Sequence, residues 1–298
     1  RSMATQTGSP AVRPKFGLGV AILAVSTSAI LINWSRAPAV VQALYRVLFT
    51  TLLLAPVALR RHADAFRSFS ARSYLWLAVP GVFLAVHFAL WFESLDWTSV
   101  AASVTLVQSQ PLFVAAGAAL LLDERFSRRM LAGVVVATAG TVLLSLGDLL
   151  GGPVLGAWPL YGNALALASA VALAAYIVAG RSFRQRLSVV PYVTVVYTVC
   201  AIVLLAVAVG NDLPLTAYPP REWLLFAGMA VGPGILGHTV LNWSLGHLES
   251  GVVSVTLLAE PVGSAILAYL LLNEVVGPTT AVGGAVVLAG IYLAAADQ

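Results

Sequence analysis

Polar residues that can bind a ligand or transfer a proton are few in this sequence, and they lie inside long apolar segments. Two of them, Gln110 and Glu260, stand directly before a proline, Pro111 and Pro261. A proline leaves the carbonyl four residues earlier without its helical donor, so each segment presents a free carbonyl beside a polar side chain. Such a kink can serve as a binding element. The same two side chains could instead stabilise the kink or bond to a neighbouring helix.

Two histidines are each followed, four residues later, by a side chain that lies on the same helix face. His87 is paired in this way with Trp91, and His238 with Asn242. Imidazole, indole and amide groups can hydrogen-bond an amino or carboxylate group without the cost of burying a charge. A single histidine in a membrane helix can equally bond to a neighbouring helix, so the sequence allows either role.

Further candidates to line a binding site are a cation, an amide and a set of aromatic residues. Arg46 lies inside an apolar segment, where it either extends toward the outer surface or attracts a carboxylate. Gln108 is the second amide near Pro111. The aromatic candidates for stacking against a ring are Trp34, Phe83, Phe88, Tyr176 and Trp243. Trp34 could also belong to an interfacial aromatic belt.

Enzyme signatures are missing from the sequence. It has no H-E-x-x-H, no G-x-S-x-G and no phosphate-binding loop, and Cys200 is the only cysteine. His87, His238 and Glu260 could form an acid–base set in an intramembrane enzyme, but they lie at different predicted depths and lack a nucleophile. We therefore expect no enzyme activity, no cofactor and no metal site.

The elements that position these residues are predicted to be membrane-spanning helices. Hydrophobic residues make up 60% of the 298 residues and charged residues only 9%, with a mean hydropathy of +0.93. The apolar runs are about 20 residues long, and a helix of that length spans the hydrocarbon core of a bilayer. Ten spans are predicted, at residues 16–34, 39–59, 73–95, 98–122, 130–147, 157–179, 189–209, 222–245, 250–272 and 278–295.

The distribution of basic residues predicts the orientation. With the N-terminus in the cytoplasm, thirteen of the sixteen Lys and Arg residues fall on the cytoplasmic side, and only Arg36 and Arg221 fall outside. Both termini are then cytoplasmic. We expect a multi-pass protein of the bacterial inner (plasma) membrane. Residues 1–15 form an N-terminal tail that begins with an apparent cloning scar, Arg1-Ser2. The basic residues serve topology, so nucleic acid is not an expected partner.

The chain repeats itself at an offset of 150 residues. Pro111 then matches Pro261, and residues 120–124 (LLLDE) match residues 270–274 (LLLNE). Gly133 and Gly140 match Gly283 and Gly290, which we expect to be close-packing positions. We predict an all-α membrane protein with a five-helix repeat at 16–147, a linker at 148–156 and a second five-helix repeat at 157–295. Because five is odd, the second repeat must be inverted, and inverted repeats are typical of transporters with a central site.

These motifs resemble the drug/metabolite transporter superfamily, in its ten-helix EamA-type branch. The matching pieces are Ser109-Gln110-Pro111 with residues 122–124, and Ala259-Glu260-Pro261 with residues 272–274. By length and by residues 241–247 (LNWSLGH), the chain is most similar to YddG-type exporters of aromatic amino acids. The resemblance implies helices around a central cavity, alternating access, and export of aromatic or other large neutral amino acids as the small-molecule substrate.

Other functions are compatible with this sequence. The chain could export drugs or other metabolites, although a nucleotide sugar or phosphorylated substrate should require more membrane cations than Arg46. A channel is a further alternative. Besides substrate, the lipid bilayer is the expected partner, and the sequence leaves the oligomeric state open, a monomer included.

Overall fold

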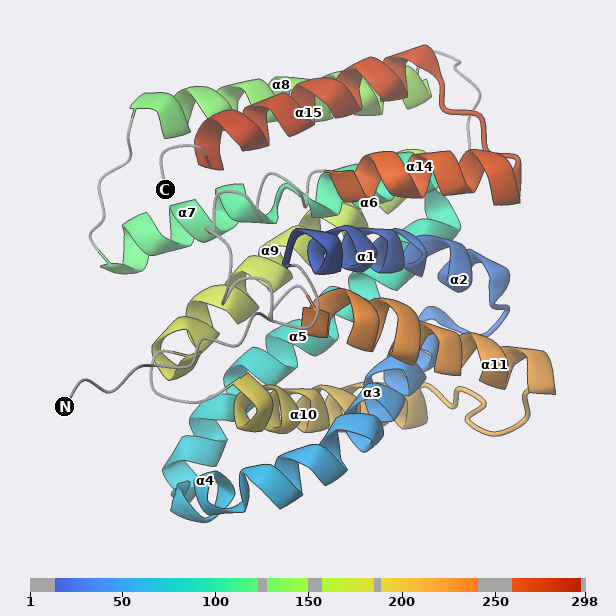
Figure 1. Ribbon diagram of the computed structural model, residues 1–298. Coiled ribbons are helices and arrows are strands. Elements are labelled where there is room, and N and C mark those ends of the chain that lie inside the picture. The colour runs from blue at the N-terminus through green and yellow to red at the C-terminus, as the bar shows by residue number, and fades with distance from the viewer. Residues whose placement is uncertain (1–13, 123–127, 150–156, 185–188, 241–258, 296–298) are drawn as a thin grey trace.

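The computed structural model describes residues 14–122, 128–149, 157–184, 189–240 and 259–295. Within these ranges the regular elements are all helices (Figure 1). The first half contains α1 (Pro14–Ser26), α2 (Ser28–Trp34), α3 (Ala39–Arg61), α4 (Ala63–Ser68), α5 (Ala71–Trp97), α6 (Val100–Val107), α7 (Gln110–Leu122) and α8 (Arg128–Leu149). The second half contains α9 (Pro159–Arg184), α10 (Val189–Gly210), α11 (Pro220–Met229), a π-helix (Ala230–Thr239), α14 (Ala259–Leu272) and α15 (Pro278–Ala295).

Five helical segments in the described ranges are long and apolar enough to cross a membrane. They are Phe16–Trp34, Ala39–Arg61, Ala71–Trp97, Pro159–Gly180 and Val190–Gly210. These coincide with the predicted first, second, third, sixth and seventh spans. Shorter apolar helices occupy the fourth, fifth, ninth and tenth predicted spans. The full number of ten spans and the inversion of the second repeat remain predictions, and residues 241–258 of the eighth and ninth predicted spans lie outside the described residues.

Apolar side chains also cover much of the outside of the molecule, as a bilayer requires. Leu75 of α5 is 71% exposed and Leu224 of α11 is 74% exposed. Buried apolar residues form one large core across both halves of the chain, including Ile30, Phe92 and Phe226. A chain with an apolar interior and an apolar exterior suits lipid rather than water as its solvent.

Two of the predicted spans are broken near their middle. The first span divides at Thr27, whose hydroxyl donates a hydrogen bond to the Ala24 carbonyl at 2.7 Å. The fourth span divides at Gln108 and Ser109, just before Pro111 of α7. Hydroxyl side chains and proline both compete with regular helical hydrogen bonding, which accounts for the two breaks. Each break frees backbone and polar side chains inside the membrane.

The helices α8 and α15 lie side by side along one side of the molecule (Figure 1). The repeat-related glycines meet at this contact. A side-chain carbon at Gly140 would collide with the backbone of Gly283 and Val287, and one at Gly290 with the backbone of Gly133 and Ala137. The absence of side chains therefore lets the two backbones approach closely.

Substitution of Gly290 by Ala is expected to destabilise the protein by about 1–3 kcal/mol, because the opposing backbone cannot move aside as a flexible side chain would. The measurement is thermal unfolding in detergent. Gly19→Ala in α1 is the matched control, because a side-chain carbon there has no atom within 4 Å. Equal melting temperatures for the Gly290 variant and the parent would contradict the close packing of α8 and α15.

Candidate functional site

Arg46 is buried inside the helix bundle and does not extend to the surface. Its side chain is 2% exposed, and its Nη1 donates a hydrogen bond to the Ser28 hydroxyl at 3.0 Å. Its guanidinium carbon lies 4.7 Å from the Phe88 ring centroid, 5.6 Å from that of Phe92 and 5.7 Å from that of Trp91. Aromatic faces attract a guanidinium through their quadrupole, so α5 supplies an aromatic wall for the cation.

Glu260 brings a carboxylate into the same region. Its Oε2 accepts a hydrogen bond from Gln108 Nε2 at 2.6 Å, and its charge interacts with that of Arg46. The Ser26 hydroxyl lies 3.5 Å from the Glu260 carbonyl, and Ser264 Oγ donates to the Ser26 carbonyl at 3.2 Å. The first half of the chain thus supplies a cation and an amide, and the second half supplies the acid.

The helix breaks explain why these groups can meet. Ser28 begins α2 directly after the break in the first span, and Gln108 lies in the break of the fourth. Glu260 lies in the first turn of α14. In transporters, interrupted helices near the middle of the bilayer expose backbone and polar groups to a substrate or an ion. The Arg46–Glu260 region, here called the central polar site, has this construction.

His87 lies beside the central polar site, but its Nδ1 is already engaged by another helix. It lies 2.8 Å from the Ser169 hydroxyl and 3.1 Å from the Ser169 carbonyl of α9. The Ser169 hydroxyl also lies 3.1 Å from the His87 carbonyl. This geometry supports a packing role for His87 between α5 and α9. Its ring stacks on Trp91 with centroids 5.9 Å apart.

Two of the predicted site residues have buried polar atoms without a hydrogen-bond partner. They are Nε1 of Trp91 and Oε1 of Gln110. Trp91 belongs to the aromatic wall around Arg46, and Gln110 begins α7 just past the break that contains Gln108. A buried donor or acceptor without a partner is costly, so each of these atoms is a candidate contact for a ligand.

The other predicted site residues are more scattered. Phe88 lies under Arg46, whereas Trp34 and Phe83 are each 37% exposed. Tyr176 is half-buried and packs against the apolar core, as Tyr197 does. Asn242, Trp243 and the side chain of His238 lie outside the described residues.

Several residues near Arg46 or Glu260 are absent from the candidates that the sequence suggested. They are Ser26, Ser28, Phe92 and Tyr197. The run Ser26-Thr27-Ser28 inside an apolar segment could have predicted the break at Thr27, because three consecutive hydroxyl residues favour a break in a membrane helix. Phe92 and Tyr197 differ from other aromatic residues only through the packing of α3 against α5 and α10, which spacing along the chain does not reveal.

A separate apolar pocket of about 540 Å³ lies between α6, α14 and α15. Pro261 lines it on the α14 side and Thr105 on the α6 side. Its lining carries no charged side chain. The pocket therefore offers apolar contact but none of the charge found at the central polar site.

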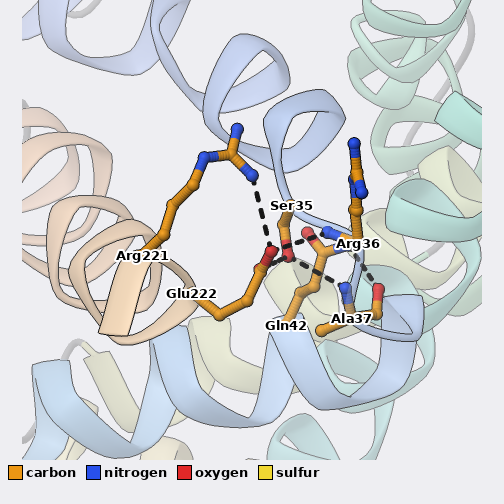
Figure 2. A network of polar contacts seen from close by, with 6 residues as sticks. All are labelled: Ser35, Arg36, Ala37, Gln42, Arg221 and Glu222. Carbon is orange, nitrogen blue, oxygen red and sulfur yellow. Dashed lines mark hydrogen bonds and ion pairs between the residues drawn. The ribbon is translucent and has the colours of Figure 1, made fainter. Parts of the chain in front are cut away.

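A second polar network joins the two halves of the chain at the predicted outer side (Figure 2). Glu222, in the first turn of α11, is 3% exposed. Its carboxylate accepts hydrogen bonds from the Ser35 hydroxyl at 2.5 Å and from the Arg36 backbone N–H at 3.1 Å, and it lies 3.7 Å from Nη1 of Arg221. The α2–α3 connection is thereby fixed to α11.

Glu274, between α14 and α15 at the predicted outer side, forms a similar contact. Its carboxylate accepts hydrogen bonds from the backbone N–H groups of Val100 and Ala101, at the N-terminus of α6. Burial raises the pKa of Glu274, and the two backbone donors act in the opposite direction. A carboxylate at a helix N-terminus also interacts favourably with the helix dipole. Both outer carboxylates therefore hold helices together across the chain.

Substitution of Glu222 by Ala is expected to destabilise the protein, because the Ser35 hydroxyl and the Arg36 N–H lose a charged acceptor. Hydrogen bonds to charged groups contribute about 1.5–3 kcal/mol each. Thermal unfolding in detergent measures the effect. Arg36→Ala is the control, since Arg36 donates through its backbone and keeps this bond. A loss of stability in Arg36→Ala as large as that in Glu222→Ala would refute the assigned role of the carboxylate.

Comparison with known proteins places this architecture in a family. The sequence profile of the EamA-like transporter family matches residues 16–146 and 160–296. Two proteins of Archaeoglobus fulgidus, each described as an uncharacterized transporter, are 27% identical over 225 residues and 29% identical over 229 residues. These alignments cover 74% and 73% of this chain, and 75% and 78% of the two relatives.

A solved structure, described only as the crystal structure of a protein, supports the fold. It aligns with a TM-score of 0.63 over 94% of this chain and 96% of its own, at 21% sequence identity. At that identity the likeness concerns the fold alone. The match of the family profile to both halves carries the assignment: the chain belongs to the EamA-like transporter family of the drug/metabolite transporter superfamily, and it is a multi-pass membrane transporter.

Proposed function

We propose that this protein is a secondary transporter that exports small neutral metabolites, chiefly aromatic and other large neutral amino acids, by alternating access. The observation that carries the proposal is the central polar site. A buried cation, Arg46, and a half-buried acid, Glu260, come from different halves of the chain and interact electrostatically beside an aromatic wall. A zwitterion with a ring matches each of these features.

The balance of charge favours a zwitterion over a larger anion. Arg46 is the only Lys or Arg within the ten predicted spans, and Glu260 opposes it. A nucleotide sugar or a phosphorylated metabolite carries more negative charge than one cation neutralises. An α-amino acid brings one charge of each sign and leaves the site neutral overall. Phe88, Trp91 and Phe92 offer faces for a ring, each contact contributing about 0.5–1.5 kcal/mol.

Alternating access would require contacts between the two halves to break and re-form. The Glu222 and Glu274 networks join helices at the predicted outer side, so their release would open a path from the central polar site to the outside. The outward direction of transport comes from the family resemblance. With both termini in the cytoplasm, the substrate would leave the cell across the plasma membrane.

The test is an efflux assay in cells that overproduce the protein. The cells are loaded with labelled phenylalanine, tryptophan, threonine or a cationic dye, and efflux is compared with an empty-vector control. Faster efflux of phenylalanine or tryptophan is the expected result. Efflux of the dye alone would identify a drug exporter instead, and efflux of none of the four would refute the proposed substrate class.

An inactive variant sharpens this assay. Arg46→Gln should abolish the efflux of phenylalanine at matched expression, because the variant keeps a polar side chain but loses the charge. Arg67→Gln is the matched control, since its guanidinium is exposed on α4. Efflux above the empty-vector control that is equal in both variants would exclude Arg46 from the transport site.

A further inference from the structure

The indole N–H of Trp91 is a buried donor without a partner. Its side chain is 5% exposed, and Nε1 makes no hydrogen bond. Two other indoles show how such a group is usually satisfied: Trp97 Nε1 donates to Glu93 at 2.8 Å, and Trp223 Nε1 donates to the Tyr218 carbonyl at 3.2 Å. The Trp91 donor is therefore available to an acceptor on a ligand.

The surroundings of this donor decide what kind of acceptor fits. The Arg46 guanidinium carbon lies 5.7 Å from the Trp91 ring, and the Phe88 and Phe92 rings surround the same cation. An N–H donor beside a buried cation attracts an oxyanion, and charge-assisted hydrogen bonds are the strong ones. A planar guanidinium also matches the two oxygens of a carboxylate.

We infer that Arg46 and the Trp91 indole N–H together form a subsite for the carboxylate of the transported molecule. The inference rests on the proposed function, in which the central polar site binds substrate. Arg46 supplies the positive charge, and the indole N–H of Trp91 donates a hydrogen bond to one oxygen of the carboxylate. Glu260, whose charge interacts with that of Arg46, would attract the substrate's ammonium group.

Two neighbouring groups are less suited to this task. His87 stacks on Trp91, but its Nδ1 is engaged by Ser169. The amide of Gln108 already donates to Glu260. A phosphate dianion is a poorer ligand than a carboxylate, because a single guanidinium next to an acid leaves one of its charges unbalanced. The subsite is thus specific for a monoanionic oxygen group.

The inference is tested by ligand binding to the purified full-length protein, measured by isothermal titration calorimetry. Three probes share a benzene ring: phenylalanine, 3-phenylpropionate, which lacks the ammonium group, and 2-phenylethylamine, which lacks the carboxylate. Trp91→Phe retains a ring and removes the N–H. We expect this variant to bind phenylalanine and 3-phenylpropionate about tenfold more weakly, as for the loss of one hydrogen bond to a charged group. Its affinity for 2-phenylethylamine should not change.

Trp97→Phe is the matched control and should bind all three probes as the parent does, because it removes an indole N–H that bonds to Glu93. A parent that binds no carboxylate probe, or a Trp91→Phe variant that binds all probes equally well or weakens all three equally, overturns the subsite. If the variant does not fold, the parent labelled with ¹⁵N-tryptophan gives the answer: 3-phenylpropionate should shift one indole N–H resonance that 2-phenylethylamine leaves in place, and no selective shift overturns the subsite.

The two proposals fail in different ways. Carboxylate-selective binding that depends on Trp91, without efflux of any amino acid, upholds the subsite and refutes amino acid export. Efflux of phenylalanine with no dependence on the Trp91 N–H upholds export and refutes the subsite.

Discussion

Replacement of Arg46 by Gln is expected to lower substrate transport by at least about 30-fold, the loss associated with removing one partner of a buried charge pair. The variant takes the cation away from three aromatic rings and from the Ser28 hydroxyl, and it leaves Glu260 without the nearby positive charge. Efflux of labelled phenylalanine from cells, at expression matched by immunoblot, measures the effect.

Arg46→Lys separates charge from shape. Lysine keeps a cation but lacks the planar fork that stacks on Phe88 and binds two carboxylate oxygens. Partial transport by the Lys variant and none by the Gln variant is the expected order. Full transport by Arg46→Gln, with a melting temperature equal to that of the parent, would exclude Arg46 from the transport site.

Substitution of Glu260 by Ala is the second change with a large expected effect. It should reduce transport strongly without abolishing folding, because it removes the only acid of the central polar site and leaves the Gln108 amide without its 2.6 Å acceptor. Gln108→Ala should reduce transport less, since the carboxylate and its interaction with Arg46 remain. Both variants are measured in the same efflux assay.

Glu260→Gln tests whether the acid also carries a proton. The amide can still accept a hydrogen bond from Gln108 but cannot titrate, so we expect the pH dependence of transport to flatten. Glu93→Gln serves as the control, because Glu93 bonds to Trp97 at the end of α5, away from the central polar site. A pH profile of Glu260→Gln equal to that of the parent would exclude proton coupling through Glu260. If Glu260→Ala and Gln110→Ala both transport at the parental rate, the two residues only stabilise the helix kinks.

The sequence was sufficient to locate the five long apolar helices that the described residues contain. Apolar length is a local property, and a bilayer demands about 20 residues for each span. The segments Phe16–Trp34, Ala39–Arg61 and Ala71–Trp97 therefore appear within two residues of their predicted bounds. The sequence also placed Arg46 and Glu260 inside apolar runs, where a charge demands a partner or a function. The membrane class followed from such local features, and the transporter family from the motifs around Pro111 and Pro261.

The partners of these side chains depended on tertiary structure. The repeat aligned Glu260 with Gln110, yet the hydrogen bond to Glu260 comes from Gln108, two positions earlier and on another helix face. Spacing gives the face of a residue within its own helix, but not the rotation of that helix against its neighbours. The break between α6 and α7 changes this rotation in the middle of the span.

Spacing along the chain also did not reveal which neighbouring helix contacts each side chain of α5. His87 and Trp91 share a face by sequence, and both are buried, but Ser169 of α9 engages His87, whereas the indole N–H of Trp91 has no hydrogen-bond partner. Phe83, one turn earlier, is instead 37% exposed. Hydrophobicity and charge along the chain determined that this protein spans a membrane and carries a residue of each charge within its apolar segments. Only the packing of helices distant in sequence decided that Arg46 and Glu260 lie in one region, with the unpaired indole N–H of Trp91 beside Arg46. Contacts between helices depend on the rotation of each helix against its neighbours and on where each helix is broken.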